Sequence, residues 1–530
     1  MAEKILVINL KNETVEEHHY SYENDRVYGR GLVLELLKKY VPDGAGRYSE
    51  DNALVIAPGF LAGNKSPSTN RMFVATAEDR GKGIQLCNTT GNMPQKLGSL
   101  GIAAIVIQGI AEEESTVLRI SNNEVEFTTR PELTGAGVRD IVHGLKAAYN
   151  NDIAIVGTGK CGDMRMSLSS MFLTYPHGRP EYHSPRSGFG DIFGSKNLRA
   201  VVIDTKDYFT RDNKNPDEFW ELSKQLTQKI INDEVCGGAL PTYGSITIMK
   251  ILKSKASLAE LSKEDKKKSL EIDKFKDNAT SSEACNMRMN KTCSPMCVIG
   301  CLNRHSGEDG KKYESPSQVE VEAAVKNCFG IEDFELSRAI QDRATEMSLV
   351  SVEYVTAAKA YAEAIGIEHG EEHLIEWLDE IEQGTAVGRI IASRTYGIGK
   401  LYADKGIEAL MDRRAIQDES LFNIKIDSRY PRLKGMSAID LLYAQIFVLE
   451  NLGFCIFTSF ALLDSDDTFE MLAKMFSLRT GIETTGEDLI IQARECIEAE
   501  KAYEQQRWEV ARETNIPPFT KVLYRYFDNN

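Results

Sequence analysis

Three cysteines at regular intervals are the residues of this sequence with the clearest chemical potential. Cys293, Cys297 and Cys301 stand in the segment CSPMCVIGC, with three residues between neighbouring cysteines. Thiolates are soft ligands that suit zinc and iron–sulfur clusters. Zinc sites usually combine two close cysteines with a distant pair, whereas three close cysteines and one remote cysteine are typical of [4Fe–4S] ligation. From spacing alone, a cluster, a zinc site and three buried apolar cysteines all remain open.

The local structure of this segment and the identity of a fourth ligand are also open. The spacing could place the three thiols on one face of a helix, but Pro295 and Gly300 interrupt the segment and equally favour a loop. Cys455 lies in ENLGFC, where Gly453 would allow the backbone to approach a bulky group closely. The candidates for a fourth ligand are Cys285, Cys328, Cys455 and Cys496.

Other motifs carry weaker signals. The segment GTGKCG (157–162) matches G-x-G-x-x-G, but the residues after it favour a strand or turn rather than the helix that a dinucleotide site requires. His369 and His373 are four residues apart on an expected helix, a spacing that is more typical of an exposed pair than of metal ligands. Glu320 and Glu322 alternate with valine, which is consistent with a polar face or with acid–base chemistry.

The elements that must position these residues change in character along the chain. Residues 1 to about 207 contain short β-branched runs bounded by Gly, Asn and Asp, which predict strands, and one helix is expected at 29–41. From about 215 the periodicity predicts helices, and the polar segment 207–216 marks the boundary. The run TTGEDL begins the last expected helix (484–513) with Thr484 and Glu487 in the capping-box pattern. The expected strands are KILVINL, NALVIAPG, RMFVATA, IAAIVIQGI, STVLRI, NEVEFTT, DIAIVGTG and LRAVVIDT; the other expected helices are 217–233, 335–366 and 371–384.

Length and charge narrow the function classes. A chain of 530 residues is too long for one core and predicts two to four domains. The net charge of −16 argues against a nucleic-acid partner, because phosphate binding requires a basic surface. No targeting segment or membrane-length apolar run is visible, so a cytoplasmic protein is expected. In such a protein a tight cysteine cluster favours metal or redox chemistry over disulfides.

Several motifs together resemble the aldehyde ferredoxin oxidoreductase family of tungsten or molybdenum bis-pterin enzymes. They are CSPMCVIGC, the remote ENLGFC and the segment GFGDIFGSKNLRAVVI, with YGRGLVLELL, ALVIAPGFLAG, NRMFVATA and GIAAIVIQGIAE in the family's order. The resemblance implies an α+β fold in which an N-terminal β domain of two sheets precedes two mostly helical domains. The expected bounds are 1–210 for the pterin-binding β domain, 211–415 for the helical domain with the cysteine cluster, and 416–530 for the helical domain with the late cysteine.

The resemblance also implies site residues. The cluster ligands would be Cys293, Cys297, Cys301 and Cys455, although the family commonly has two residues between its first two cysteines and this chain has three. The family's two D-x-x-G-L-[DC] motifs would fall at EMSLVS, where Leu349 replaces the glycine, and at ENLGFC. A glutamate after the cysteine cluster would be the catalytic acid or base, and Glu320 is the nearest match. The pterin-binding residues implied are Arg71, Asn88, Gly91, Ser184, Arg186, Glu346, Glu450 and Gly453.

The implied reaction interconverts an aldehyde and a carboxylate and passes electrons through a [4Fe–4S] cluster to ferredoxin or a partner iron–sulfur subunit. The resemblance allows magnesium at the pterin phosphates and a homo- or hetero-oligomer. The family's histidine before the late cysteine is missing, since His373 is the last histidine. The missing histidine and the altered EMSLVS motif keep two alternatives to the aldehyde reaction open. One is a reductase of an enoate or aromatic thioester within a larger complex, and the other is a non-catalytic subunit that carries the cluster.

Overall fold

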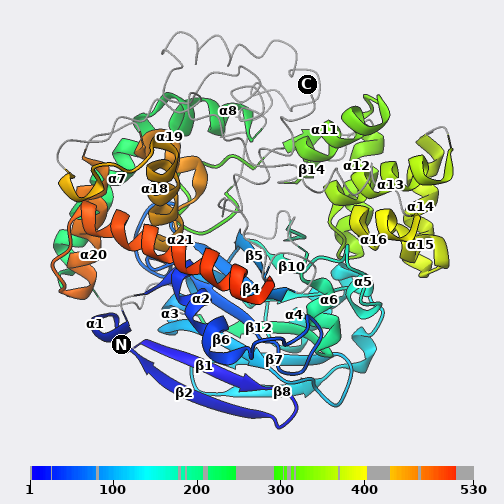
Figure 1. The fold of residues 1–530 in the computed structure, drawn as a ribbon, viewed down its shortest axis with the longest axis horizontal. Helices are drawn as coiled ribbons and strands as arrows, with labels where there is room; N and C mark the ends of the chain where they lie inside the picture. The colour runs from blue at the N-terminus through cyan, green and yellow to red at the C-terminus, as the bar shows by residue number, and fades with distance from the viewer. Residues whose placement is uncertain are drawn as a thin grey trace.

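Two mixed sheets and two helical bodies make up the computed structural model (Figure 1). The structure describes residues 3–25, 27–78, 83–176, 181–185, 188–206, 213–245, 292–302, 304–306, 312–315, 318–367, 371–402, 430–463 and 467–508. Arg186, His369, Cys285 and the end of the helix expected at 484–513 lie outside these residues. Within them, no helix combines the length and the apolar character that crossing a membrane requires.

The first sheet has the strand order β2-β1-β6-β3-β4-β5. Only β1 and β6 run parallel in it; the other neighbours are antiparallel. The expected strands are confirmed here, and β2 and β5 are additions that the sequence did not reveal. The bounds are β1 Glu3–Asn9, β2 Thr14–Tyr20, β3 Leu54–Pro58, β4 Arg71–Glu78, β5 Gly83–Thr90 and β6 Ile102–Gln108.

The second sheet has the order β11-β10-β9-β12-β7-β8, with β7 and β12 parallel. Alternate residues of its strands face opposite sides, as a pleated strand requires. Val201 and Ile203 pack toward the first sheet, whereas Ala200 and Val202 pack under helix α4. The bounds are β7 Thr116–Ser121, β8 Val125–Thr129, β9 Ala154–Gly157, β10 Phe172–Thr174, β11 Tyr182–His183 and β12 Leu198–Asp204.

Short helices cover and connect the sheets. Helix α2, which confirms the helix expected at 29–41, packs its apolar side on the outer face of the first sheet. The segment GTGKCG leads into the four-residue helix α5, so the long helix of a dinucleotide site does not follow it. The bounds are α1 Tyr22–Asp25, α2 Gly29–Tyr40, α3 Met93–Ser99, α4 Val138–Ala148, α5 Lys160–Asp163 and α6 Gly190–Ser195.

The helices after residue 215 form two separate hydrophobic cores. One core joins α7 to α18, α20 and α21, so the first helix after the β domain packs with the last helices of the chain. Its members are α7 Pro216–Asn232, α8 Leu240–Tyr243, α18 Ala438–Leu452, α19 Ser459–Leu462, α20 Thr468–Thr480 and α21 Gly486–Trp508. The domain bounds expected from the sequence remain predictions.

The other core lies among α11–α16, on the right of Figure 1. The run expected to be helical at 335–366 is divided into α12 and α13 by a turn at Met347–Val350. Gly384 ends α14 with a φ of +69°, as expected of a C-cap. The bounds are α11 Gln318–Phe329, α12 Phe334–Glu346, α13 Ser351–Ile365, α14 Glu371–Gln383, α15 Ala386–Ile391 and α16 Arg394–Tyr402; a hairpin of β13 Arg304–Ser306 and β14 Lys312–Glu314 precedes them.

The capping box expected at the start of α21 was misplaced by one residue. Thr485, not Thr484, exchanges hydrogen bonds with a residue three positions on: its Oγ1 accepts from the Asp488 N–H at 3.2 Å, and its own N–H donates to Asp488 Oδ2 at 2.9 Å. Glu487 instead accepts from Arg432 Nε at 2.8 Å. The sequence T-T-G-E-D allows a capping box to begin at either threonine. Because Glu487 bonds to Arg432, the box forms between Thr485 and Asp488.

Candidate redox site

The cysteine segment is a loop, not a helix. Met296 and Gly300 have φ angles of +58° and +71°, which are incompatible with a continuous right-handed helix. The loop lies against residues 66–70, where Ser68 accepts from the Val298 N–H at 3.1 Å and donates its own N–H to the Met296 carbonyl at 2.8 Å. Asn70 Nδ2 donates to the Pro295 carbonyl at 2.8 Å. The β domain therefore shapes the cysteine loop directly.

Cys455 reaches the same place from the other end of the chain. Helix α18 ends at Gly453, whose φ of +94° turns the chain back. The Gly453 carbonyl accepts from the Arg71 N–H at 3.1 Å, and the Cys455 N–H donates to the Ser68 carbonyl at 2.8 Å. Ser68 thus contacts both the cysteine loop and the late cysteine.

The four partly buried thiols influence one another's ionisation. A hydrogen bond between Cys293 and Cys297 raises the pKa of Cys293 and lowers that of Cys297, which N–H groups of Gly300 and Ile299 lower further. Burial, with the neighbouring thiols, raises the pKa values of Cys301 and Cys455. The cysteine loop and the segment of Cys455 together bring four thiols to one place, with N–H donors directed at the Cys297 sulfur, and such thiols are suited to a Cys₄ cluster.

The side chains of the cysteine site are not arranged around one metal ion in the described structure. Among the residues that the structure describes, no group of three or more His, Cys, Asp or Glu side chains is placed to hold one metal ion. A zinc site needs its four ligands on one ion at about 2.0–2.3 Å. A [4Fe–4S] cluster offers each cysteine its own iron, so the sulfurs surround a larger group.

The first group of expected pterin residues is assembled beside the cysteines. Arg71 donates from Nε to Asn88 Oδ1 at 2.8 Å and from Nη2 to the Asn88 carbonyl at 2.9 Å. Asn88 Nδ2 donates to Glu450 Oε1 at 2.9 Å. Arg71 is also the nearby cation that lowers the pKa values of Cys301 and Cys455 against the effect of burial. Side chains from β4, β5 and α18 thus form one polar group next to the thiols.

Ser184 and Glu346 lie together at a second place, where the end of helix α12 meets strand β11 of the second sheet. Glu346 accepts from the Tyr182 hydroxyl at 2.6 Å and from the Arg139 N–H at 3.2 Å, and Ser184 Oγ lies 3.5 Å from the Thr345 carbonyl. Gly91, directly after β5, packs against β10: a Cβ there would be 2.5 Å from the Thr174 carbonyl oxygen. The expected pterin residues therefore form two groups on two sheets, with donors and acceptors suited to a polar heterocycle and its phosphate.

Glu320 and the remaining candidates lie elsewhere. Glu320 is in the first turn of α11, in the helical body on the right of Figure 1, and its side chain is partly buried. Cys328 is on the same helix and Cys496 is on α21, so neither stands in the cysteine loop. His373 stacks on Trp377 with ring centroids 5.5 Å apart. Ser68, Asn70 and Arg30 are site residues that the sequence analysis missed, because nothing in their local pattern distinguishes them.

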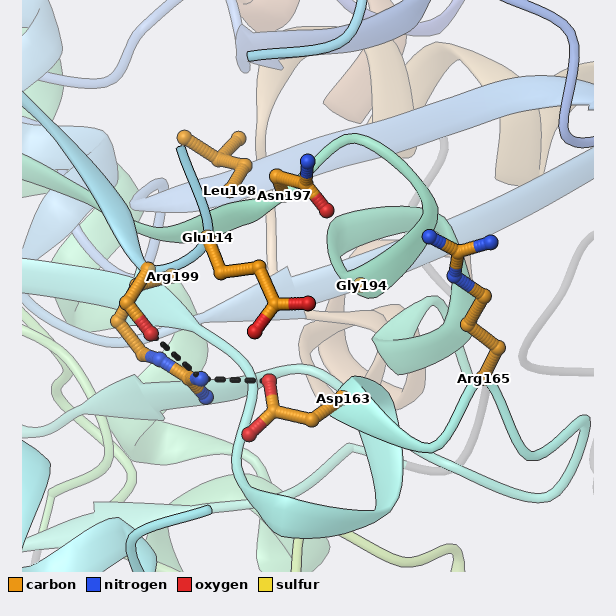
Figure 2. Close-up of a pocket in the computed structure, with 8 residues that line it drawn as sticks. Glu114, Asp163, Arg165, Gly194, Asn197, Leu198 and Arg199 are labelled. Atoms are coloured by element: carbon orange, nitrogen blue, oxygen red, sulfur yellow. Dashed lines mark hydrogen bonds and ion pairs between the residues drawn. The ribbon is translucent and has the colours of Figure 1, made fainter. Parts of the chain in front are cut away.

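A small polar cavity lies on the second sheet, apart from these groups (Figure 2). Its volume is about 50 Å³. Arg199 and Asp163 form an ion pair at 2.5 Å in its wall, and burial raises the pKa of Asp163. A cavity of this size holds water molecules rather than an organic cofactor. The lining residues are Glu114, Ser115, Asp163, Arg165, Gly194, Asn197, Leu198 and Arg199.

Comparisons with known proteins agree with the resemblance. Residues 5–205 match the family model "Aldehyde ferredoxin oxidoreductase, N-terminal domain". The tungsten-containing aldehyde ferredoxin oxidoreductase of Pyrococcus horikoshii is 22% identical over 527 residues, covering 88% of this chain and 83% of the relative. The enzyme of the same name from Pyrococcus abyssi is 26% identical over 252 residues, covering 47% of this chain and 40% of the relative.

A solved structure has the same fold. It is the active-site complex BamBC of benzoyl coenzyme A reductase in complex with 1,5-dienoyl-CoA, which matches with a TM-score of 0.73 at 18% identity over 99% of this chain and 94% of that chain. The architecture of two N-terminal sheets followed by helical bodies is therefore shared along the whole chain. Residues 5–205 match the N-terminal domain of the aldehyde ferredoxin oxidoreductase family, and the chain as a whole is similar to a tungsten-containing member of that family at 22% identity.

Proposed function

We propose that the chain is an oxidoreductase that holds a [4Fe–4S] cluster on Cys293, Cys297, Cys301 and Cys455 beside a tungsten or molybdenum pterin. The observation that carries the proposal is the convergence of two distant segments on Ser68, which places Cys455 with the cysteine loop. Thiols brought together in a reducing compartment are ligands for a soft metal centre. Relatives named as tungsten-containing oxidoreductases support this choice.

The pterin would be held by the two polar groups. Arg71, Asn88 and Glu450 would hold one pterin next to the cluster; the family resemblance adds Gly91, whose close contact is with the Thr174 carbonyl. Ser184, Arg186 and Glu346 would hold the second pterin. The substitutions in EMSLVS make the support for this second pterin weaker than for the first. When bound, the metal pterin would accept two electrons from a substrate and release them one at a time to the cluster.

The reaction proposed is the interconversion of an aldehyde and a carboxylate. Oxidation combines the aldehyde with water, which supplies the second oxygen, and releases two electrons and two protons as the carboxylic acid forms; ionisation of the acid to the carboxylate releases a third proton. Glu320, whose partly buried side chain lies in the first turn of α11, is the acid or base that the family resemblance proposes for these protons. The electrons would leave to ferredoxin or to an iron–sulfur subunit.

A second candidate reaction is the reduction of an aromatic thioester or enoate within a larger complex. The structural likeness to the benzoyl coenzyme A reductase complex favours it, as do the altered first motif and the missing late histidine. A third candidate is a subunit that carries the cluster without the metal pterin.

Metal content and dye-linked assays separate these candidates. Protein purified without oxygen would be analysed for tungsten, molybdenum, iron and zinc. It would then be assayed with a viologen dye, using aldehydes in the oxidising direction and aromatic acyl thioesters in the reducing direction. Aldehyde turnover supports the first reaction and thioester turnover the second. Iron without tungsten or molybdenum would leave only the electron-transfer role, and zinc in place of iron would contradict the proposal.

A further inference from the structure

A chain of side-chain hydrogen bonds runs from helix α21 to Arg71, whose backbone N–H bonds to Gly453 just before Cys455. Arg30 donates to Glu500 from Nε at 2.9 Å and from Nη2 at 2.6 Å, and its Nη1 donates to Glu450 Oε2 at 3.0 Å. Glu450 Oε1 accepts from Asn88 Nδ2, and Asn88 Oδ1 accepts from Arg71 Nε. Five side chains from α21, α2, α18, β5 and β4 are thereby connected.

The three charged members at the far end are almost completely buried. The exposed fractions are 2% for Arg30, 1% for Glu450 and 5% for Glu500. Buried charges are costly unless they are paired in good geometry, so these side chains have little freedom to reorient. The Arg30 guanidinium also lies over the Phe447 ring, 4.8 Å from its centroid. Arg30, Glu450 and Glu500 therefore form a fixed group to which the Asn88 amide is hydrogen-bonded.

The charge of Glu450 determines how the Asn88 amide is oriented. An ionised carboxylate can only accept hydrogen bonds, so it requires the NH₂ side of the Asn88 amide to face it. The carbonyl side, Oδ1, must then face Arg71, whose guanidinium can only donate. If Glu450 moved, the amide could turn so that its NH₂ group faced the Arg71 guanidinium, which cannot accept a hydrogen bond. Arg71 would then lose its Nε bond.

Of the two arginines in this chain of hydrogen bonds, Arg71 lies nearer to the cluster cysteines. Its backbone N–H donates to the carbonyl of Gly453, two residues before Cys455, at 3.1 Å. A fixed positive charge beside a cluster stabilises the additional electron of the reduced state, because hydrogen bonds and net charge around the sulfurs set the potential. Moving this cation away would lower the reduction potential.

We propose that Arg30 and Glu500 are positioning residues: by holding Glu450 they fix the Asn88 amide, which keeps the Arg71 guanidinium beside the cluster cysteines and sets the reduction potential of the cluster. The inference rests on the cluster assigned under the proposed function. It extends the redox site to a helix that begins more than 30 residues after Cys455.

The sign of the potential shift in Glu500→Gln tests the proposal. Arg30 would lose its charge-assisted bonds to position 500 and turn onto Glu450, where it competes with Asn88 for Oε1. Release of Arg71 would lower the potential enough to change the ratio of reduced to oxidised cluster about tenfold at a fixed potential, which is about 59 mV for one electron. A purely through-space effect has the opposite sign, because removing a negative charge raises the potential.

Glu504→Gln is the matched control. Glu504 is also buried on α21, one turn after Glu500. Glu504→Gln removes the same charge, and Glu504 is not among the Arg30 contacts that the described structure contains. It should leave the potential unchanged or raise it slightly. Each variant would be titrated by dye-mediated redox titration, with the cluster followed by electron paramagnetic resonance.

A double-mutant cycle and a milder variant complete the test. Asn88→Ala should lower the potential by itself, and adding Glu500→Gln to it should lower the potential no further. If Glu500→Gln does not fold, Glu500→Asp decides, because it keeps the charge and shortens the reach; the proposal expects a lowered potential. A raised or unchanged potential in the folded Glu500 variants would overturn the proposal. Absence of any iron–sulfur signal in the unchanged protein would instead refute the proposed function.

Discussion

Gly59 and Gly453 touch back to back: a Cβ built on Gly59 would lie 2.2 Å from the Cα of Gly453. Gly59 follows β3, and Gly453 ends α18 nearly 400 residues later. The Arg71 N–H donates to the Gly453 carbonyl at 3.1 Å, and its own carbonyl accepts from the Gly59 N–H at 2.8 Å. This contact brings the end of α18, and with it Cys455, against the sheet that holds Arg71.

Gly453→Ala should destabilise the protein and displace Cys455. Its φ is +94°, and a Cβ there would lie 2.5 Å from the Thr69 carbonyl oxygen, which belongs to the backbone. Strain and collision together should cost about 3 kcal/mol or more. Urea unfolding and iron content would measure the two effects.

Gly435→Ala separates strain from collision. Gly435 has nearly the same φ, +93°, but nothing lies within 4 Å of its Cβ position. This variant should cost only about 1–2 kcal/mol and keep its iron. Equal losses in the two variants would contradict the account of the close contact.

Cys455→Ser should remove or destabilise the iron–sulfur chromophore, because serine replaces a thiolate ligand with a harder oxygen. Visible absorption and iron per chain of anaerobically purified protein would show this. Cys328→Ser is the control, since Cys328 is partly buried on α11 among apolar residues. An intact spectrum in Cys455→Ser would show that Cys455 is not a ligand.

Glu346→Ala should weaken folding while leaving the cluster in place. Glu346 accepts from the Tyr182 hydroxyl and from the Arg139 N–H in the first turn of α4, where the helix dipole favours a negative charge. Losing both bonds should cost about 1–3 kcal/mol in urea unfolding. Glu363→Ala, which removes an exposed ion pair of α13, should cost less than about 0.5 kcal/mol. Loss of iron in Glu346→Ala would show that the two polar groups are not independent.

Lys196 should make stability depend on pH in the alkaline range. It is 2% exposed, and burial lowers its pKa to about 8 from 10.5. Between these pH values the unfolded chain binds the proton and the folded chain has released it, so folding gains up to about 3 kcal/mol as pH rises from 8 to 10.5. Below pH 8 the penalty for burying the charge is complete.

Lys196→Met removes this titration. The difference in melting temperature between the unchanged chain and Lys196→Met should shift in favour of the unchanged chain as pH rises from 8 to 10.5. A difference that is constant over this range would contradict the lowered pKa. Because both proteins share every other titrating group, the comparison isolates Lys196.

The sequence predicted the parts of the fold that depend on local pattern. Strands such as β3 and β6 are continuous apolar runs, and α2 and α7 show helical spacing, so their existence follows from periodicity. Strand β2, TVEEHHY, is a mostly exposed, polar strand at a sheet edge and lacks that signal. The capping box moved by one residue because Glu487 bonds to Arg432, a contact between segments 55 residues apart.

The site was predictable only where a motif named it. Cys455 and Glu450 could be proposed because ENLGFC resembles a family motif, and the structure brings both to the place that Arg71 and Asn88 occupy. Ser68 could not be predicted, since its role comes from backbone contacts with two segments more than 220 residues away. Arg30 and Glu500 are 470 residues apart, and only the packing of α2 against α18 and α21 brings them together.

The metal content of protein purified without oxygen tests the central claim most directly. The account predicts about four iron atoms per chain, together with stoichiometric tungsten or molybdenum, and loss of the iron in Cys455→Ser. Zinc in place of iron, or a chain that binds neither iron nor tungsten or molybdenum, would contradict it.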